Sequence, residues 1–179
     1  SNHNIDDELI MVYDLGGGTF DLTILTNSKN KIHVIAKGGI SNLGGKEFDE
    51  IIEKKIQDTY INLFNTSLPN NNLNRNRLNS ISEEIKINLN LSTKSGFNKW
   101  IYLGKRFFKI YFDKMEYDLL ATTLIAKTES AVNKSLRSIG IQLSEIHKIV
   151  LIGGASSNNL VYDFWKQKPF AVLEYENVS

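Results

Sequence analysis

The feature that most constrains the fold is the run DLGGGTFD at residues 14–21. A buried strand is predicted before it, from Leu9 to Leu15, and a strand with alternating faces follows, from Thr19 to Thr26. Three glycines between two strands predict a tight turn that an anion can approach closely, because glycine has no Cβ and successive N–H groups can bind an anion. Asp14 and Asp21 flank this turn, and two carboxylates beside bound phosphate suit a hydrated magnesium ion.

This run matches neither of the common nucleotide-binding fingerprints. The chain has no G-x-x-x-x-G-K-S/T sequence, and no helix is predicted directly after the glycines, as a dinucleotide fingerprint requires. The alternative without a ligand is a glycine-rich hairpin with two surface acids. Acids on both sides of the turn favour the phosphate interpretation, with these candidate residues: Asp14, Gly16, Gly17, Gly18, Thr19 and Asp21.

The rest of the chain mixes predicted strands and helices, which indicates an α/β fold. The first three strands follow one another closely and predict an antiparallel meander. The further elements expected are a strand at 31–37, helices at 48–64 and 75–91, a hairpin at 100–112, a helix at 113–138, a strand at 148–152, a helix at 158–167 and an extended piece at 170–175. In the helix at 113–138, Asp113 and Glu116 have the spacing of a capping box.

Two more glycine clusters and one helix face are candidate parts of the same site. LGGKEFD at residues 43–49 places glycines at a helix start, where N–H groups are free, and IVLIGGAS at 149–156 ends a buried strand in paired glycines. On the predicted helix SEEIKINLN, the spacing i, i+3, i+4, i+7 aligns Glu83, Lys86, Ile87 and Asn90. The alternatives are a plain helix entry, a tight strand-to-helix turn and a solvated helix face.

Composition narrows the function classes. The 179 residues suffice for one domain or two small ones, and the absence of cysteine excludes disulfides and thiolate zinc sites. The three histidines show no ligand spacing, and no apolar run approaches the roughly 20 residues of a membrane span. A net charge of +1 creates no bulk field for anions. We therefore expect no nucleic-acid partner and no membrane partner.

The ordered set of motifs resembles the nucleotide-binding domain of the DnaK-type, seventy-kilodalton heat-shock chaperones. The matching segments are DLGGGTFD, LGGKEFD, SEEIKINLN, FDKMEYDLL and IHKIVLIGGAS, and they cover essentially the whole chain from about Leu9. The first motif alone is shared loosely with actin, bacterial actin homologues and sugar kinases, whereas all five together are quite specific. The resemblance implies an actin-like ATPase fold in which this chain is the second of two ribonuclease-H-like α/β lobes.

The resemblance also implies a division of the chain. Residues 9–66 and 113–179 would form the ribonuclease-H-like subdomain, and residues 67–112 an inserted subdomain of a helix and a β-hairpin. Alternatively, the first helix of the insertion begins within residues 44–66.

Roles for the site residues follow from the same resemblance. Gly16, Gly17, Gly18 and Thr19 would form a phosphate loop, and Asp14, Thr19 and Asp21 would be catalytic, the two acids holding the water shell of magnesium. The implied adenosine pocket consists of Gly45, Glu83, Lys86, Ile87, Asn90, Gly153, Gly154, Ala155 and Ser157. Ser157 stands where the family usually has an arginine that stacks on adenine, so weaker or altered nucleotide binding is expected.

The implied function is that of a cytoplasmic, ATP-hydrolysing chaperone of the stress response, with ATP or ADP and magnesium as cofactors. Nucleotide-exchange factors, J-domain co-chaperones and unfolded peptides, the last bound through another domain, are the implied partners. The family's first phosphate loop, lysine and catalytic glutamate belong to the other lobe, so this fragment alone is expected to hydrolyse ATP negligibly. Alternatives are a degenerate, non-catalytic interaction module and a filament-forming actin homologue or sugar kinase; IVLIGGAS and SEEIKINLN argue against the last two.

Overall fold

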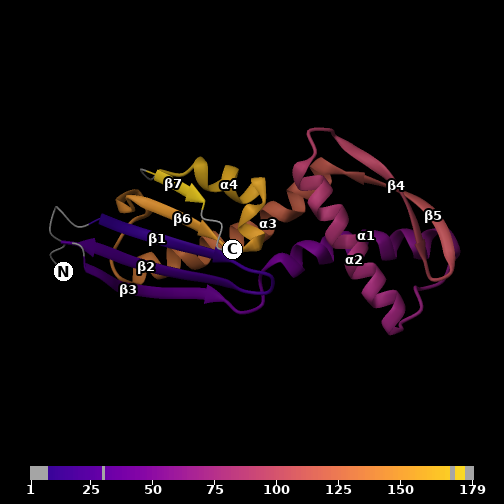
Figure 1. Ribbon diagram of the computed structural model, residues 1–179, viewed down its shortest axis with the longest axis horizontal. Helices are drawn as coiled ribbons and strands as arrows, with labels where there is room; N and C mark the ends of the chain where they lie inside the picture. The colour runs from indigo at the N-terminus through magenta and orange to yellow at the C-terminus, as the bar shows by residue number, and fades with distance from the viewer. Residues whose placement is uncertain (1–7, 30, 170–171, 176–179) are drawn as a thin grey trace. The chain divides into compact units, whose positions relative to one another are not determined.

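The structure is a computed structural model, and it describes residues 8–29, 31–169 and 172–175 (Figure 1). The elements in chain order are β1 (Glu8–Leu15), β2 (Phe20–Ser28), β3 (Lys31–Ile40), α1 (Gly45–Phe64), α2 (Asn72–Leu91), β4 (Gly96–Leu103), β5 (Arg106–Asp113), α3 (Lys114–Ser138), the short 3-10 helix η1 (Leu143–Glu145), β6 (Lys148–Ile152), the 3-10 helix η2 (Gly154–Ser157), α4 (Asn159–Lys166) and β7 (Val172–Tyr175). The α/β prediction is confirmed. Of the extended piece predicted at 170–175, residues 170–171 lie outside the described residues and the remainder is β7.

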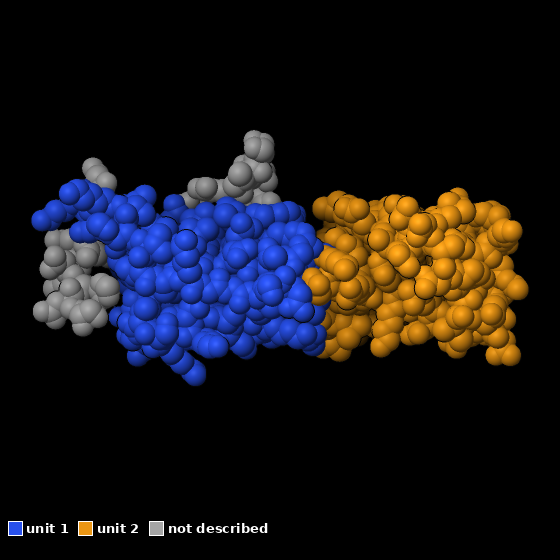
Figure 2. Space-filling model, turned by 90° about the horizontal axis from the view of Figure 1, so that it is seen from below, with its two compact units in different colours: residues 1–45, 123–179 blue, residues 46–122 orange. Residues whose placement is uncertain are grey.

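The chain forms two compact units, residues 1–45 with 123–179 (unit 1) and residues 46–122 (unit 2), coloured blue and orange in Figure 2. The sequence expectation was 66/67 and 112/113, with the alternative that the first helix of the insertion begins within residues 44–66; unit 2 includes most of that helix and extends beyond residue 113. The difference arises because α1 packs within unit 2: the ring centroids of Tyr60 and Phe108 are 5.8 Å apart, and Lys55 forms an ion pair with Glu116. Most of α1 and the first turns of α3 therefore belong with α2 and the hairpin.

Unit 1 is built on a five-stranded sheet with the order β3-β2-β1-β6-β7. The predicted antiparallel meander of β1, β2 and β3 is confirmed, and β6 lies parallel to β1. Side chains of β1 alternate between buried and half-buried positions, as the period of two requires. Leu15 pairs with Phe20 and Asp14 pairs with Asp21, so the two acids occupy the same face of the sheet.

Helices α3 and α4 cover the opposite face. Tyr13, fully buried on β1, has its hydroxyl 2.8 Å from Oγ1 of Thr128 on α3, and its ring centroid lies 5.4 Å from that of Trp165 on α4. Because neighbouring side chains of a strand point to opposite faces, this packing directs Asp14 away from the helices. The sheet thus separates its apolar core from the face that carries the acids.

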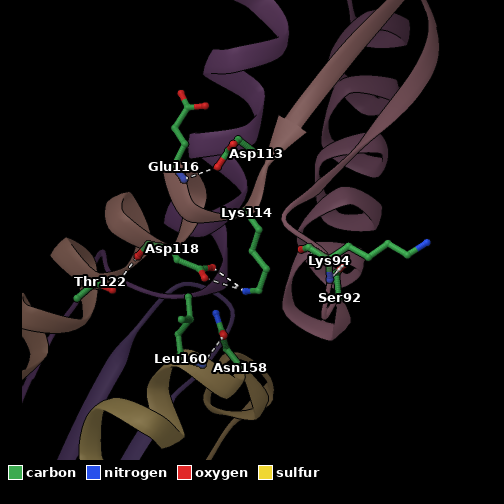
Figure 3. Close-up of polar contacts among 9 residues, drawn as sticks. All are labelled: Ser92, Lys94, Asp113, Lys114, Glu116, Asp118, Thr122, Asn158 and Leu160. Atoms are coloured by element: carbon green, nitrogen blue, oxygen red, sulfur yellow. Dashed lines mark hydrogen bonds and ion pairs between the residues drawn. The ribbon is translucent and has the colours of Figure 1, made fainter.

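Capping residues determine where helices begin in both units. Oδ1 of Asn71 accepts a hydrogen bond from the N–H of Asn74, so α2 starts three residues before the predicted Arg75. Asp113 caps α3 by accepting from the N–H of Glu116, whereas the carboxylate of Glu116 pairs with Lys55, so only half of the predicted capping box is seen (Figure 3). Figure 3 also shows the cap of α4, where Asn158 accepts from the N–H of Leu160.

Within unit 2, the hairpin of β4 and β5 begins four residues earlier than predicted, at Gly96. Exposed and buried residues alternate from Trp100 to Leu103 and from Phe107 to Phe112. Among the residues that the structure describes, no helix is both long and apolar enough to cross a membrane.

Candidate functional site

The three-glycine turn is held by two backbone hydrogen bonds. The N–H of Gly16 donates to the carbonyl of Thr19 and the N–H of Gly45 donates to the carbonyl of Gly16, each over 2.9 Å. Gly17 and Gly18 are exposed, and a Cβ built on either would meet no atom within 4 Å. The turn is therefore fixed at its base while its outer backbone is open to a ligand.

Gly44 supports the turn from beneath, although it was not among the predicted site residues. A Cβ on this buried glycine would lie 2.6 Å from the nitrogen of Gly18 and 2.7 Å from the carbonyl oxygen of Gly16. No side chain fits at such distances without moving the turn. The start of α1 and the glycine turn are thus packed backbone against backbone.

Two carboxylates and one hydroxyl flank the turn. Asp14 and Asp21 are direct register partners on β1 and β2, and Oγ1 of Thr19 donates to Oδ2 of Asp21 over 3.0 Å. Burial raises the pKa of Asp14, and the charge of Asp21 raises it further. A cation bound beside this pair would relieve both effects, because it stabilises the ionised carboxylates.

The second glycine cluster meets Asp14 directly. Gly153 has φ +88°, and a Cβ there would collide with Oδ1 of Asp14 and lie 2.5 Å from the carbonyl oxygen of Leu15. The N–H of Leu15 donates to the buried hydroxyl of Ser156 over 3.2 Å, which ties the end of β1 to η2. The chain between β6 and α4 therefore packs tightly onto the strand that bears Asp14.

The remaining unit 1 candidates gather around the same turn. A Cβ on Gly45 would lie 3.6 Å from the carbonyl oxygen of Gly17 and 3.7 Å from Cβ of Ala155. Gly154 is exposed with open space beside it, and the exposed Ser157 donates its hydroxyl to the carbonyl of Gly154 over 2.7 Å. The structure thus brings together the predicted residues of unit 1: Asp14, Gly16–Gly18, Thr19, Asp21, Gly45, Gly153, Gly154, Ala155 and Ser157.

The other four predicted adenosine residues lie on α2, in unit 2. Glu83 and Ile87 are exposed, Ile87 to 48%, while Lys86 and Asn90 are half-buried. Nζ of Lys86 forms an ion pair of 2.8 Å with Oδ1 of Asp49 on α1. Burial raises the pKa of Asp49, and Lys86 opposes that increase. Lys86 therefore contributes to the packing of α1 on α2.

The donor set bears on which metal the turn could accept. Among the described residues, no group of three or more His, Asp or Glu side chains is arranged to hold a metal ion. Magnesium usually keeps several water molecules and binds through one or two carboxylates together with substrate phosphates. The pair of Asp14 and Asp21 fits that mode, in which the nucleotide supplies the other ligands.

Three contributors lie within the candidate motifs but were not among the predicted site residues: Gly44, Asp49 and Ser156. Gly44 is part of the LGGKEFD run, and the close backbone packing that needs it has a signal in the paired glycines. Asp49 and Ser156 act through partners far away in the sequence, and the local pattern around each gives no signal for that contact.

Comparisons with known proteins agree with the motifs. A family model described as "Hsp70 protein" matches residues 2–173. The "Chaperone protein dnaK" of Cyanidium caldarium is 31% identical over 97% of the chain, and the "Chaperone protein HscA" of Buchnera aphidicola is 31% identical over 95%. The "Iron-sulfur cluster biogenesis chaperone, mitochondrial" of Saccharomyces cerevisiae is 30% identical over 92%. The chain spans 29%, 27% and 27% of these relatives in the same order, which is less than a third of their length.

Proposed function

Because this chain belongs to the Hsp70 protein family, and so to the chaperones with an actin-like nucleotide-binding domain, we propose that it is the second lobe of that domain. In this proposal the open glycine turn binds the phosphates of ATP. The observation that carries it is the turn itself, fixed at its base by the hydrogen bonds of Gly16 and Gly45 and open at Gly17 and Gly18.

The phosphates would meet backbone N–H groups at Gly17 and Gly18, where no Cβ hinders their approach. Thr19 has a hydroxyl at the same turn, beside Asp21. Its single proton is donated to Asp21, so the hydroxyl can accept a hydrogen bond from a water as it stands and would have to rotate to donate to a phosphate. We assign Thr19 to the γ-phosphate or to the water that attacks it.

Asp14 and Asp21 would hold magnesium through its water shell. The bound ion would neutralise phosphate charge, which is the main requirement of phosphoryl transfer. The raised pKa of Asp14 supports this role, since a carboxylate destabilised by burial and by a neighbouring acid gains most when a cation binds. Ionised Asp14 and Asp21 would also accept hydrogen bonds from the attacking water and so orient it.

Adenosine contacts are proposed for each unit by itself. In unit 1, Gly45, Gly153, Gly154 and Ala155 offer backbone and small side chains against which a flat base can lie. On α2, the exposed apolar side chain of Ile87 would pack on adenine, and the polar set of Glu83, Lys86 and Asn90 would reach the ribose and base. The α2 set offers both apolar and polar contact, as nucleoside sites usually do.

The proposed activity is ATP hydrolysis by the longer protein. The family's other lobe supplies the first phosphate loop and further charged groups, so the 179-residue chain by itself would bind nucleotide weakly and turn it over negligibly. Peptide clients, J-domain co-chaperones and nucleotide-exchange factors are the partners proposed for the longer protein. Each relative named above is called a chaperone, which supports this proposal at the level of the family.

Isothermal titration of the purified chain with magnesium-ATP and with adenosine tests the binding site. Asp21→Asn should weaken magnesium-ATP binding about tenfold or more and leave adenosine binding unchanged, because it removes one carboxylate from the ion. Asp163→Asn is the matched control, since Asp163 is an exposed carboxylate of the same unit on α4. Equal magnesium-ATP affinity of the two variants would contradict the assignment.

One observation favours a second candidate, a non-catalytic interaction module. Ser157 folds its hydroxyl back onto the carbonyl of Gly154 and offers no planar group to stack on a base. Absence of any binding of adenosine or magnesium-ATP at millimolar concentration, in this chain and in the longer protein, would establish that candidate instead.

A further inference from the structure

The end of β1 and the segment after β6 are joined by one side chain, that of Ser156. Strands β1 and β6 run parallel side by side, and their register ends at Asp14 and Ile152 (Figure 1). The N–H of Leu15 lies one residue beyond this ladder. Oγ of Ser156 accepts a hydrogen bond from it over 3.2 Å. A side chain of η2 therefore continues the pairing of β1 after β6 has ended.

This hydrogen bond is shielded from water. Leu15 has no exposed surface and Ser156 is only 1% exposed. A hydrogen bond is electrostatically stronger in such surroundings than in water, and breaking it leaves a buried backbone N–H without an acceptor. Ser156 and Leu15 are therefore expected to move together rather than apart.

On one side of the bond, Ser156 belongs to the segment proposed to lie against the base. Its N–H donates to the carbonyl of Gly153 over 3.0 Å, which closes one turn of η2. Gly154 and Ala155 lie within that turn, and Gly154 is exposed with open space beside it. An adenosine resting on Gly154 and Ala155 would restrict the whole turn, including the backbone of Ser156.

On the other side of the bond, Leu15 leads directly into the three-glycine turn. The next residue, Gly16, donates its N–H to the carbonyl of Thr19 over 2.9 Å and so forms the base of that turn. The preceding residue is Asp14, one of the two acids proposed to hold magnesium. A displacement of Leu15 would consequently shift both the carboxylate and the phosphate turn.

A second contact between the same segments is of a different kind. The backbone of Gly153 packs so closely against Asp14 and Leu15 that a Cβ would collide with both. Such packing limits how near the segments can come, but it does not hold them together. The bond between Ser156 and Leu15 resists their separation, so it is the contact through which a restriction of η2 reaches β1.

From this arrangement we propose that Ser156 is a positioning residue that couples the binding of adenosine to the binding of magnesium and phosphate. The inference rests on the proposed nucleotide site and adds how its two halves communicate. The buried hydroxyl of Ser156 is engaged at Leu15 and acts through that residue. Adenosine that orders η2 also orders Leu15, so less conformational freedom is left to lose when the phosphates bind.

The coupling favours complete nucleotides over their parts. It is reciprocal, because each ligand must raise the affinity for the other by the same factor. A ligand that occupies only one half of the site, such as inorganic pyrophosphate or a free nucleoside, gains nothing from it. Ser156 would thus act as a determinant of specificity for nucleoside phosphates.

Isothermal titration of the chain with magnesium pyrophosphate, with and without saturating adenosine, measures the coupling. Pyrophosphate represents the two outer phosphates of ATP and leaves the place of the third empty, so that both ligands fit. Adenosine is uncharged, so it adds no direct charge attraction for pyrophosphate. In the unsubstituted chain, adenosine should raise the affinity for magnesium pyrophosphate at least about fivefold.

Ser156→Ala should lower this factor to less than about twofold, and Ser156→Thr, which keeps the hydroxyl, should restore it. A merely structural role of Ser156 would weaken each ligand alone and leave the factor unchanged. Ser138→Ala is the matched control. It removes an exposed hydroxyl of the same unit, which donates to the carbonyl of Ser135 on α3, and should keep the full factor.

Hydrogen exchange of backbone amides, followed by nuclear magnetic resonance, gives a second readout that needs no substitution. Adenosine alone should slow the exchange of the N–H groups of Leu15 and Gly16 at least about threefold, although neither residue is proposed to contact it. The same experiment on Ser156→Ala should show no such protection. If that variant does not fold, as judged by its circular dichroism, exchange in the unsubstituted chain decides the question.

Three results would overturn the inference. They are equal coupling factors in the parent and in Ser156→Ala, failure of Ser156→Thr to restore the factor, and unchanged exchange at Leu15 when adenosine is bound. Absence of binding of both ligands at millimolar concentration would overturn the proposed nucleotide site together with the inference. Binding of both ligands with equal factors would overturn the coupling alone.

Discussion

Lys86 of α2 and Asp49 of α1 form an ion pair in which Nζ and Oδ1 are 2.8 Å apart, and both side chains are largely shielded, with 17% and 20% of their surface exposed. The pair joins two helices of unit 2. It also involves a residue proposed to contact adenosine, so stability and nucleotide binding are linked at Lys86.

Lys86→Met should therefore destabilise unit 2. The change leaves Asp49 half-buried without that partner, and the expected loss is about 1–2 kcal/mol in the free energy of unfolding, between the values for exposed and for buried pairs. Urea unfolding followed by Trp100, which belongs to unit 2, measures it. Lys127→Met, at an exposed lysine of α3, is the control.

The double variant Asp49→Asn with Lys86→Met separates the two roles of Lys86. If the pair acts as a unit, removing both charges should cost less than the sum of the single changes. Adenosine binding should stay weak in the double variant if Lys86 also contacts the nucleoside. Additive losses of stability would show that the pair contributes nothing.

Asp14 should lower stability at neutral pH. Its pKa in the folded state lies above the ordinary value of 3.8, because of burial and then of Asp21. Between 3.8 and the raised value the unfolded chain binds fewer protons than the folded one, so the free energy of unfolding decreases as pH rises through this window. Above the raised pKa, Asp14 is ionised in both states, and its full destabilising effect on the folded chain is present.

Asp14→Asn should consequently raise the melting temperature at pH 7, by on the order of 1 °C for a chain of this size, while weakening magnesium-ATP binding. The difference between variant and parent should vanish below pH 3.8. Differential scanning calorimetry across this pH range measures both effects. A variant less stable than the parent at pH 7 would show that Asp14 stabilises the fold.

Tyr13→Phe tests the bond between β1 and α3. Burial is the main cause that raises the pKa of Tyr13 to about 12, and the hydrogen bond to Thr128 acts in the opposite direction. The folded pKa exceeds the unfolded value of 10.0. The contribution of protonated Tyr13 to the free energy of unfolding is therefore fully present below pH 10 and is lost as pH rises toward 12.

The variant should lose about 1 kcal/mol near pH 8 from the missing hydrogen bond, and its stability should decrease less steeply between pH 10 and 12. Thr128 keeps its bond to the carbonyl of Ile125 in either case. Unfolding followed by Trp165 in unit 1 reports the change. Parallel pH curves for variant and parent would contradict the assignment.

Gly153→Ala should be among the most damaging single changes in unit 1. It combines a positive φ with a Cβ that collides with Asp14 and Leu15, so a loss of roughly 2–4 kcal/mol is expected. Gly154→Ala, where a Cβ meets nothing within 4 Å, should stay within about 0.5 kcal/mol of the parent. Thermal melting of the pair measures the contrast, and equal melting temperatures would show that the backbone at residue 153 relaxes freely.

The geometry of the three-glycine turn in unit 1 was predictable because the strands on both sides of it have a local signal. Strand periodicity predicted β1 and β2, and with the turn between them fixed, Asp14 and Asp21 had to meet as register partners. The glycine pairs were interpreted as a helix start with free N–H groups and as a tight strand-to-helix turn, and the structure adds that Gly44 and Gly153 pack closely against neighbouring backbone.

What sequence could not predict depends on contacts between distant segments. The sequence left open whether the helix at 45–64 belongs with the insertion, and its place in unit 2 follows from the ring contact of Tyr60 with Phe108 and from the pair of Lys55 with Glu116, each joining residues more than forty positions apart. The role of Lys86 depends likewise on Asp49. A helix face read in isolation indicates which side chains align but not which of them has a partner elsewhere.

The parallel pairing of β6 with β1 has a consequence for synthesis of the chain. Asp14 pairs in register with Ile152, so the edge of β1 opposite β2 has no strand to meet until unit 2 has been made. At a ribosomal rate of about 5–20 residues per second, that interval lasts roughly 7–27 s. During this interval the nascent meander exposes an unpaired strand edge, and such an edge is a template for pairing with other chains.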